Sequence, residues 1–413
     1  MYIVQKFGGT SMGSIEKITN VARKVIKEMQ AGNKVVVVAS AMSGETNRLV
    51  ALFKEACGNH NTSKEIMAEY DSIVSTGEQV SCALLSVILQ TMGYRSRSLT
   101  GWQLGFETSS NHGSATIENI KTEELKSMLE EGVIPVITGF QGISDTSRIT
   151  TIGRGGSDTS AIAIAAALKA KRCDIYTDVD GVYTSDPRVV KSARKLKYVG
   201  HEEMIEMASS GAKVLEPRSV MLAMAYNLDV QVLSSFEENP TGTILTNDEN
   251  IMERRLITSV TSSKQDVEIT VKGMPDKVDT SAKLFKILAD AQITVDMIIQ
   301  NPDIQNLVIT FTVNATDLHQ TKLLLDTHKN DLEFSSYNVR DDIAKVSVIG
   351  VGMKVNSGIA YKMFAELAKN NIKPLAISTS EIKISVLVEQ KYEELAVRSL
   401  HDIFELEKPG KHS

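Results

Sequence analysis

Short apolar runs alternate with helically spaced apolar positions through the first part of the chain. Residues 2–7 form a β-type run, and apolar residues from 15 to 29 recur at helical spacing. Residues 34–39, KVVVVA, have the continuous β-branched character of a strand that is buried on both faces. This strand–helix–strand order predicts a βαβ unit with a right-handed crossover in a parallel sheet.

The same alternation continues along the chain. The pattern predicts a long apolar helix over 82–92, a buried strand over 133–137 and a buried helix over 161–171. Two more strands are predicted over 174–179 and 229–233. We therefore expect an α/β fold, with a mainly parallel sheet sandwiched by helices and polar loops after the strands.

The last third of the chain contains an internal repeat. Gly273 matches Gly352 and Phe285 matches Phe364, each pair 79 residues apart (352 minus 273). Both copies predict the order strand, helix, strand, strand, helix, which makes two small sheets covered by helices on one face. The chain turns polar and acidic at 247–253, so the predicted domains are 1–246, 262–340 and 341–413.

Composition and charge narrow the classes of function. The formal charge of −6 over 413 residues gives no sign of a nucleic-acid surface. Cys57, Cys82 and Cys173 are dispersed, and the seven histidines form no zinc-type cluster, so we expect a reducing compartment and no protein-held metal. The apolar runs fall short of the length of a membrane span, and the N-terminus lacks a signal peptide. We expect a cytoplasmic protein without membrane contact.

Residues 150–161, TTIGRGGSDTSA, are the strongest candidate for a binding site. Three glycines surround Arg154. Glycines let backbone N–H groups approach an anion closely, and the following helix adds partial positive charge. Arg154 can grip a carboxylate or phosphate with two parallel hydrogen bonds. A tight turn capped by Ser157 or Asp158 is the simpler alternative, but it leaves the arginine unexplained.

A glycine pair also follows the first predicted strand. Lys6 precedes Gly8 and Gly9 at the carboxyl end of that strand, where α/β sheets place their ligands. The order matches neither the P-loop nor the dinucleotide-binding fingerprint. A solvated lysine at the sheet edge is the alternative, and we favour a contact with phosphate.

Three more polar stretches are candidates for the same site. Residues 40–49, SAMSGETNRL, suit a loop over a small ligand or a cap before a helix. Glu78 lies near the start of the long apolar helix, where composition alone favours a glutamate that complements the helix dipole over one that binds an ammonium group. Residues 177–188 follow a strand and carry a tyrosine, aspartates and an arginine where a nucleotide could lie.

Six motifs together resemble the aspartokinase family of the amino acid kinase superfamily. The resemblance covers nearly all of residues 1–246. It implies transfer of the ATP γ-phosphate to the β-carboxylate of L-aspartate, which gives 4-phospho-L-aspartate, with Mg²⁺ carried by the nucleotide. This is the first step of lysine, threonine and methionine biosynthesis. The motifs are KFGGTS (6–11), SAMSGETNRL (40–49), STGEQVS (75–81), TTIGRGGSDTSA (150–161), TDVDGVYTSDPR (177–188) and GAKVL (211–215).

The resemblance also implies roles for individual residues. Lys6 and Asp158 would be catalytic, and Glu78 would take the substrate ammonium, which reverses the preference from composition. Arg154 would pair with the substrate α-carboxylate. The implied substrate-binding set is Ser40, Thr46, Glu78, Arg154, Gly155, Gly156 and Ser157, and the implied ATP-binding set is Lys6, Gly8, Gly9, Thr177, Asp178, Tyr183, Asp186, Arg188 and Lys213.

The C-terminal repeat resembles the paired ACT domains of aspartokinases, so we expect two small ACT-like domains of the βαββαβ type. Such domains bind amino-acid effectors and usually pair across two chains, which implies feedback by lysine, threonine or both, and a homodimer or larger assembly. The family often has Pro-Gly before each helix, whereas this chain has Val278-Asp279 and Ser357-Gly358, so we expect a reshaped first loop. The implied effector-binding residues are Asp276, Lys277, Ser281, Ala282, Asp296, Gln300, Ser357, Thr379 and Glu381.

Three alternatives stay open at this point. A superfamily member that acts on glutamate, acetylglutamate or carbamate fits less well, because the Glu78 segment and the C-terminal repeat argue against it. A catalytically silent amino-acid sensor would lack Lys6, Arg154 or Asp158, and all three are present. The repeat could also serve dimerisation alone.

Overall fold

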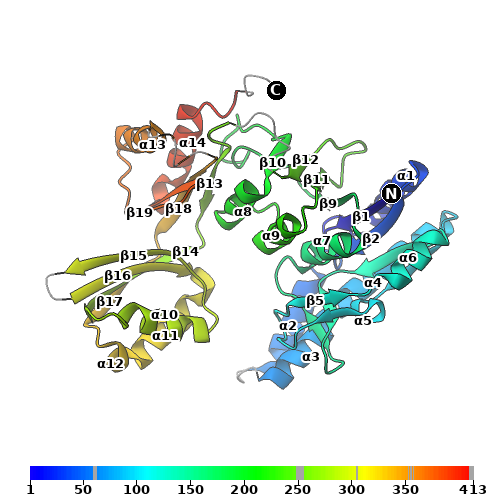
Figure 1. Ribbon diagram of the computed structural model, residues 1–413, viewed down its shortest axis with the longest axis horizontal. Coiled ribbons are helices and arrows are strands. Elements are labelled where there is room, and N and C mark those ends of the chain that lie inside the picture. The colour runs from blue at the N-terminus through cyan, green and yellow to red at the C-terminus, as the bar shows by residue number, and fades with distance from the viewer. Residues whose placement is uncertain are drawn as a thin grey trace. The chain divides into compact units, whose positions relative to one another are not determined.

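The computed structural model describes residues 1–58, 63–247, 255–303, 306–351, 353, 356 and 358–408 (Figure 1). The chain divides into two compact units. We call Met1–Tyr183, Lys195–Ser209 and Lys213–Glu253 the N-terminal unit. The C-terminal unit comprises Thr184–Arg194, Ser210–Ala212 and Arg254–Ser413. Ser357 is the one candidate site residue that lies outside the described residues.

The described part of the N-terminal unit centres on an eight-stranded sheet (Figure 1). Neighbouring strands run parallel except β11 and β12, so the predicted mainly parallel sheet is confirmed. The strands, in spatial order, are β10 (Tyr198–Gly200), β12 (Thr243–Thr246), β11 (Val230–Ser234), β9 (Arg172–Thr177), β1 (Tyr2–Phe7), β2 (Lys34–Ala39), β6 (Ile134–Thr138) and β3 (Ser96–Leu99).

Helices cover both faces of this sheet. Because side chains alternate along a strand, Val35 and Val37 of β2 join the core formed with α1 and α4, while Val36 and Val38 face the side on which α7 packs. The helices are α1 (Ile15–Gln30), α2 (Glu45–Cys57), α3 (Lys64–Val74), α4 (Thr76–Thr91), α5 (Gly101–Leu104), α6 (Glu123–Glu130), α7 (Gly156–Leu168), α8 (His201–Ser209) and α9 (Pro217–Ala225).

A second, smaller sheet in the N-terminal unit was not predicted. Its strands are only three or four residues long, too short to show a periodic pattern in the sequence. It leads the chain from β6 into the loop that carries Arg154. The order is β5 (Ile117–Ile120), β4 (Phe106–Thr108), β7 (Gln141–Ile143) and β8 (Ile149–Thr151).

One prediction about apolar length was wrong. Helices α3 and α4 follow each other so closely that Lys64–Thr91 forms a 28-residue stretch, long and apolar enough to cross a membrane by length and composition. Half of its most apolar window is buried within the structure, and Leu85 and Leu89 of α4 belong to the core formed with α1 and β2. The core of the N-terminal unit therefore accounts for this stretch.

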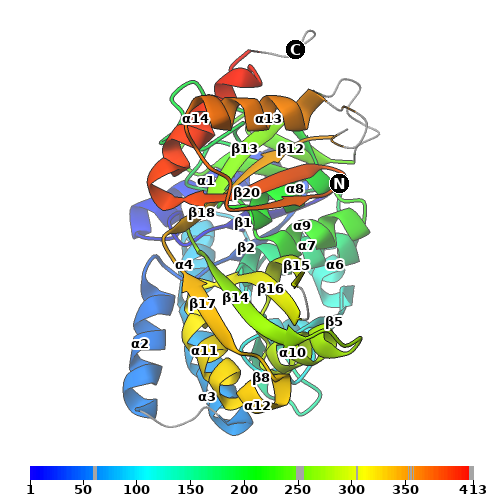
Figure 2. The same cartoon turned by 90° about the vertical axis from the view of Figure 1, so that its left-hand side faces the viewer.

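In the C-terminal unit, the first repeat forms one antiparallel sheet with helices against it (Figure 2). Its order along the chain is strand, helix, two strands, helices, strand, which confirms the predicted βαββαβ type. Leu284, Leu288 and Phe311 are among its core residues. The elements are β14 (Asp266–Pro275), α10 (Thr280–Asp290), β15 (Val295–Asp303), β16 (Asn306–Asn314), η2 (Ala315–Asp317), α11 (Leu318–Thr327), α12 (Lys329–Leu332) and β17 (Ser336–Arg340).

The second repeat completes its sheet with a strand from before the first repeat. Strand β13 (Ser259–Ser263) pairs antiparallel with β18, so the chain leaves the second sheet, builds the first repeat and returns. The sequence analysis assigned no role to β13, because the strand lies outside the 79-residue repeat. The other elements are β18 (Ile343–Ile349), α13 (Gly358–Lys369), β19 (Ala376–Thr379), β20 (Lys383–Glu389), η3 (Gln390–Tyr392) and α14 (Glu393–Ile403).

A segment from the middle of the chain belongs to the second repeat. Val190 is buried in the core of this repeat. The backbone N–H of Val260 donates to the carbonyl of Thr184 at 2.9 Å, and Arg398 Nε donates to the carbonyl of Val189 at 3.0 Å. These contacts explain why residues 184–194 cluster with the C-terminal unit.

Candidate active site

Lys6 and Asp158 meet at the carboxyl end of β1. Lys6 Nζ lies 2.5 Å from Asp158 Oδ1, and both side chains are largely buried. A Cβ at Gly8 would lie 3.5 Å from Lys6 Nζ, so the ammonium lies over the backbone of the glycine turn. Two residues far apart in sequence therefore place a paired charge beside backbone N–H groups, which suits an anionic ligand.

The start of α7 resolves the choice between a capped turn and a binding loop. The N-cap residue is Gly155, with φ +65°, and no side chain caps the helix. Asp158, which a simple turn would use as a cap, pairs with Lys6 instead. The capping interpretation is therefore not supported, and the first turn of α7 is available to a ligand.

The loop after β2 packs against the glycine turn. The N–H of Ser40 donates to the carbonyl of Phe7 at 3.0 Å, and a Cβ at Gly9 would lie 3.0 Å from the Ala41 oxygen. Ser81 Oγ donates to the Ser40 carbonyl at 2.8 Å, which ties the loop to α4. The structure thus brings three separate motifs to one edge of the sheet.

Glu78 lies beneath this loop as a buried carboxylate. Its residue is 3 % exposed, and Oε1 accepts from the N–H of Ala41 at 3.2 Å. Oε2 is buried and has no hydrogen-bond partner among the described residues. Burial raises the pKa of Glu78 to about 7, against the lowering effect of its backbone hydrogen bonds. A buried carboxylate with a spare oxygen is suited to an ammonium group.

Ser157 and the turn after β6 fit together closely. A Cβ at Gly139 would lie 2.7 Å from Ser157 Oγ, so only glycine leaves room there. Phe140 has φ +71°, and its N–H donates to Ser160 Oγ at 3.0 Å. The sequence analysis gave this turn no role, although the Thr-Gly-Phe order at a strand end was a signal for it.

Arg154 lies on an exposed loop, and among the residues that the structure describes it forms no hydrogen bond or ion pair. Gly153 has φ +81°, and a Cβ there would lie 3.4 Å from the Gly113 oxygen. The guanidinium is therefore free to meet a ligand anion, while the backbone beneath it is packed.

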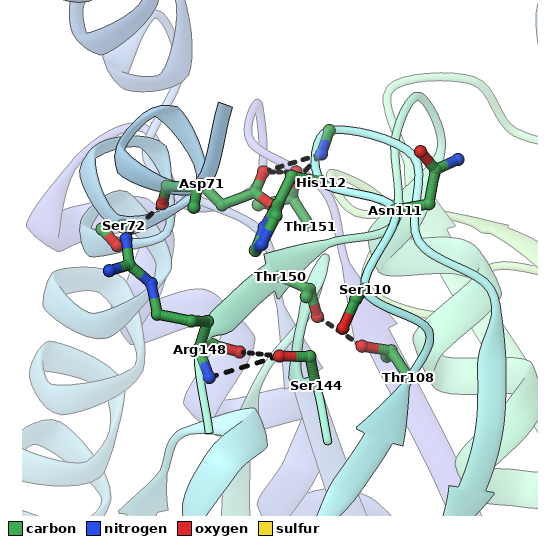
Figure 3. Close-up of polar contacts among 12 residues, drawn as sticks. Asp71, Ser72, Thr108, Ser110, Asn111, His112, Ser144, Arg148, Thr150 and Thr151 are labelled. Atoms are coloured by element: carbon green, nitrogen blue, oxygen red, sulfur yellow. Dashed lines mark hydrogen bonds and ion pairs between the residues drawn. The ribbon is translucent and has the colours of Figure 1, made fainter. Parts of the chain in front are cut away.

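A buried aspartate holds the neighbouring loop (Figure 3). Asp71 is fully buried; its Oδ2 lies 2.7 Å from His112 Nδ1, and its Oδ1 accepts from Thr151 Oγ1 at 2.5 Å and from the N–H of Gly113 at 3.1 Å. This network was not predicted, because its members lie 41 to 80 residues from Asp71 and carry no local pattern.

Some of the predicted ATP-binding residues belong to the N-terminal unit and others to the C-terminal unit. In the N-terminal unit, Tyr183 donates from its hydroxyl to Asp180 at 3.0 Å, and Lys195 Nζ lies 3.1 Å from the same carboxylate. Burial and the Asp180 charge raise the pKa of Tyr183 to about 12. Thr177 and Asp178 follow directly after β9, with Thr177 Oγ1 donating to Asp178 Oδ1 at 3.2 Å. Asp180 and Lys195 are additional to the predicted set.

The remaining predicted nucleotide residues lie elsewhere along the chain. Asp186 and Arg188 belong to the C-terminal unit and pair with each other, with Arg188 Nη2 2.7 Å from Asp186 Oδ2. Lys213 is exposed. The GAKVL motif forms the loop before α9 and does not begin that helix, because Pro217 occupies the first turn of the helix.

The predicted effector residues are more dispersed. Ser281 Oγ donates to Gln300 Oε1 at 2.7 Å, and Lys277 pairs with Glu333 at 2.9 Å. The Asp296 carboxylate binds the ammonium of Lys345, a residue of the second repeat that we had not predicted. The others — Asp276, Ala282, Thr379 and Glu381 — are exposed.

Comparisons with known proteins identify the family of this chain. The amino acid kinase family profile matches residues 1–234, and the ACT domain profile matches 267–328 and 346–404. The chain is 47 % identical to an aspartate kinase of Pseudomonas putida over 410 residues, which covers 99 % of this chain and 98 % of that protein. It is 46 % identical to aspartokinase 2 of Bacillus subtilis over 406 residues, with 98 % of both chains covered.

Solved structures of related enzymes share the fold. Escherichia coli aspartokinase III in complex with aspartate and ADP superposes with a TM-score of 0.85 at 26 % identity, covering 98 % of this chain and 99 % of that one. The same enzyme in complex with lysine and aspartate gives 0.76 at 27 % identity, covering 97 % and 99 %. The chain therefore belongs to the aspartate kinases, ATP-dependent phosphotransferases of the amino acid kinase family that act on a carboxylate, and it carries ACT domains.

Proposed function

We propose that this chain transfers the γ-phosphate of ATP to the β-carboxylate of L-aspartate, giving 4-phospho-L-aspartate and ADP, as the first step towards lysine, threonine and methionine. The observation that carries the proposal is the Lys6–Asp158 pair over Gly8, next to the buried Glu78. The complex of E. coli aspartokinase III with aspartate and ADP supports the same pair of ligands.

The proposed roles follow from charge. A carboxylate is ionised at neutral pH, so the attacking β-carboxylate needs no general base. Catalysis is then mainly positioning and neutralisation of the phosphoryl oxygens. Lys6 and the N–H of Gly9 supply that positive charge, and Asp158 orients Lys6. The N–H of Gly8, which we expected to share this role, donates to the Tyr176 carbonyl at 3.2 Å instead.

The substrate contacts follow from the same reasoning. Glu78 takes the α-ammonium and Arg154 takes the α-carboxylate, so a ligand that carries both charges is held at two points. Ser157, with Ser40 and Thr46 from the loop after β2, directs the β-carboxylate. The Gly155 N–H completes the anion-binding turn at the start of α7. The Gly156 N–H donates to the Gly153 carbonyl at 3.1 Å, so Gly156 contributes by closing that turn.

We propose that the nucleotide is held by Thr177, Asp178, Tyr183, Asp186, Arg188 and Lys213, and that Mg²⁺ arrives with it. The described residues contain no group of three or more metal-ligating side chains, so the ion would be held chiefly by the phosphates, near Asp158. Bound in this way, Mg²⁺ neutralises phosphate charge.

We infer that residues 1–246 form the catalytic domain and that residues 262–340 and 341–413 form two regulatory domains. The complex of E. coli aspartokinase III with lysine supports an amino-acid effector, and we propose that lysine or threonine binds to the repeats of this chain. Among the proposed effector positions, Ser281 contacts Gln300, Asp296 pairs with Lys345 and Lys277 pairs with Glu333. A homodimer or larger assembly through the repeats completes the proposal.

The first experiment measures ADP release from Mg-ATP with and without aspartate, then with lysine, with threonine and with both. Aspartate-dependent turnover that falls with one addition supports both parts of the proposal. Turnover without an amino-acid response reduces the repeats to a dimerisation module. Absence of aspartate-dependent turnover contradicts the substrate assignment and favours another acceptor or an amino-acid sensor.

The Arg154→Ala variant tests the substrate contact itself. Loss of a charge-assisted bidentate contact of roughly 1.5–3 kcal/mol should raise the KM for aspartate about 10- to 100-fold. The KM for ATP should change much less. A main effect on ATP would contradict the assignment of Arg154 to the substrate carboxylate.

A further inference from the structure

The first turn of α9 lies against the loop that carries Arg154, and none of the six sequence motifs includes it. Glu216 is the N-cap residue of α9 and is partly buried. A Cβ at Gly155 would come within 2.1 Å of Glu216 Cγ and 3.2 Å of its Cδ. The Glu216 side chain therefore lies directly on the backbone of the residue that follows Arg154.

Arg218, on the same turn of α9, ties this turn to two loop carbonyls. Its Nη1 donates to the carbonyl of Ile152 at 2.8 Å, and its Nη2 donates to the carbonyl of Ala115 at 3.0 Å. The N–H of Gly113, near Ala115, is held in turn by Asp71 (Figure 3). Because Arg218 holds the first turn of α9 and Asp71 holds the loop near Ala115, Glu216 stays beside the Arg154 loop.

The charges around Glu216 are unbalanced. Its carboxylate is attracted by Arg154 and repelled by Asp158, while burial is the largest cause of its raised pKa. Within the described part of the chain, neither Glu216 nor Arg154 forms a hydrogen bond or ion pair with its side chain. The guanidinium is free, and a protein carboxylate without a partner lies within electrostatic range of it.

We propose that Glu216 is a positioning residue that competes with the α-carboxylate of the substrate for Arg154 and so weakens the binding of aspartate. The inference rests on the proposed role of Arg154 as the carboxylate contact. An incoming carboxylate must overcome the repulsion of Glu216, and this repulsion is stronger in a partly buried site than in free solution.

The test is steady-state kinetics of the full chain with the isosteric variant Glu216→Gln. The variant should lower the KM for aspartate roughly two- to fivefold, the range expected for a charge pair near the surface. The KM for ATP should stay within twofold. The difference from the wild type should fade as the pH is lowered, because Glu216 of the wild type is then protonated. An unchanged or higher KM for aspartate would overturn the proposal.

Two further variants separate charge from packing. Glu216→Asp keeps the charge and should keep the KM for aspartate close to the wild-type value; an equal shift in both variants would show a packing effect and overturn the proposal. Glu202→Gln, an exposed glutamate of α8, removes the same charge away from the site and serves as the matched control.

A double-mutant cycle distinguishes failure of this proposal from failure of the Arg154 assignment. If Arg154 is not the carboxylate contact, Arg154→Ala leaves the KM for aspartate unchanged. If Arg154 is the contact and Glu216 acts through it, Glu216→Gln lowers the KM in the wild type but not in the Arg154→Ala background. A persistent effect in that background contradicts the competition.

Discussion

Two buried lysines, one in each unit, differ in the number of carboxylates that pair with them. Lys6 of the N-terminal unit has one carboxylate partner, Asp158, and lies over the backbone of Gly8, whose N–H donates to the Tyr176 carbonyl at 3.2 Å. Lys345 of the C-terminal unit is 3 % exposed and lies between two carboxylates, Asp266 and Asp296. An ammonium group has three donors, so Lys6 has capacity left for a ligand, whereas the charge of Lys345 is already balanced.

Burial and pairing with a carboxylate are therefore not enough to identify a lysine as catalytic. Lys345 comes from β18 of the second repeat, and its partners come from β14 and β15 of the first, so it joins two small sheets. Both carboxylates raise the pKa of Lys345, against the effect of its burial. Donor capacity left on a lysine beside a glycine turn, at the carboxyl end of a strand, is the better sign of a site.

The Lys6→Ala variant tests the role of Lys6 in phosphoryl transfer. We expect kcat to fall about a thousandfold, since one preorganised group that stabilises transition-state charge contributes on that scale, while the circular dichroism spectrum stays that of a folded chain. Lys34→Ala, which removes a lysine from an exposed pair with Glu130, is the control and should retain activity. Turnover that survives in Lys6→Ala would contradict the proposed mechanism.

The counterpart in the C-terminal unit is Lys345→Met. Removing the buried lysine leaves the largely buried Asp266 and the partly exposed Asp296 uncompensated, so urea unfolding should show a loss of about 3 kcal/mol in the free energy of unfolding, mainly from Asp266. Lys391→Met, from an exposed pair with Glu389, should cost less than about 1 kcal/mol. Equal losses in the two variants would mean that Lys345 is not a structural link between the repeats.

Glu78 should make the KM for aspartate depend on pH. Its pKa is raised to about 7 in the ligand-free site, and only the ionised form binds an ammonium. The KM for aspartate should therefore rise about tenfold for each pH unit below 7 and level off above it. Glu78→Gln should raise the KM and remove this dependence. A wild-type KM that is flat between pH 6 and 8 would contradict the assignment.

The smallest expected effect concerns His401 in the second repeat. Its Nε2 lies 3.0 Å from Thr184 Oγ1, and its Nδ1 is buried without a hydrogen-bond partner among the described residues, 4.0 Å from Asp402 Oδ1. Burial lowers the pKa of His401 below 6.5, against the raising effect of the Asp402 charge. Below pH 6.5 the unfolded chain binds a proton that the folded chain excludes, so stability should fall on acidification, by at most about 1.4 kcal/mol per pH unit.

Thermal melting between pH 7.5 and 5.5 tests this prediction. The midpoint of the wild type should fall with pH more steeply than that of His401→Gln, which cannot be protonated. His319→Gln removes an exposed histidine and should behave like the wild type. Parallel curves for wild type and His401→Gln would show that this histidine does not contribute to the acid sensitivity.

Much of the fold followed from local pattern. The apolar run of β2 and the glycine pair after β1 predicted a parallel sheet with ligands at its carboxyl edge, and the 79-residue repeat predicted two small sheets. The short strands of the β5-β4-β7-β8 sheet and the pairing of β13 with β18 were not predicted, because short strands carry no periodicity and pairing between distant segments leaves no trace in one sequence.

For the site, the sequence by itself determined which residue types gather after each strand: Lys6 before glycines, Arg154 between glycines and Glu78 at the start of a helix. Only the tertiary structure decided that Lys6 pairs with Asp158, that Glu78 is buried with a free oxygen, and that Glu216 lies on Gly155. The reason is physical. Local sequence sets backbone conformation, whereas desolvation and charge pairing depend on neighbours that only the folded chain brings together.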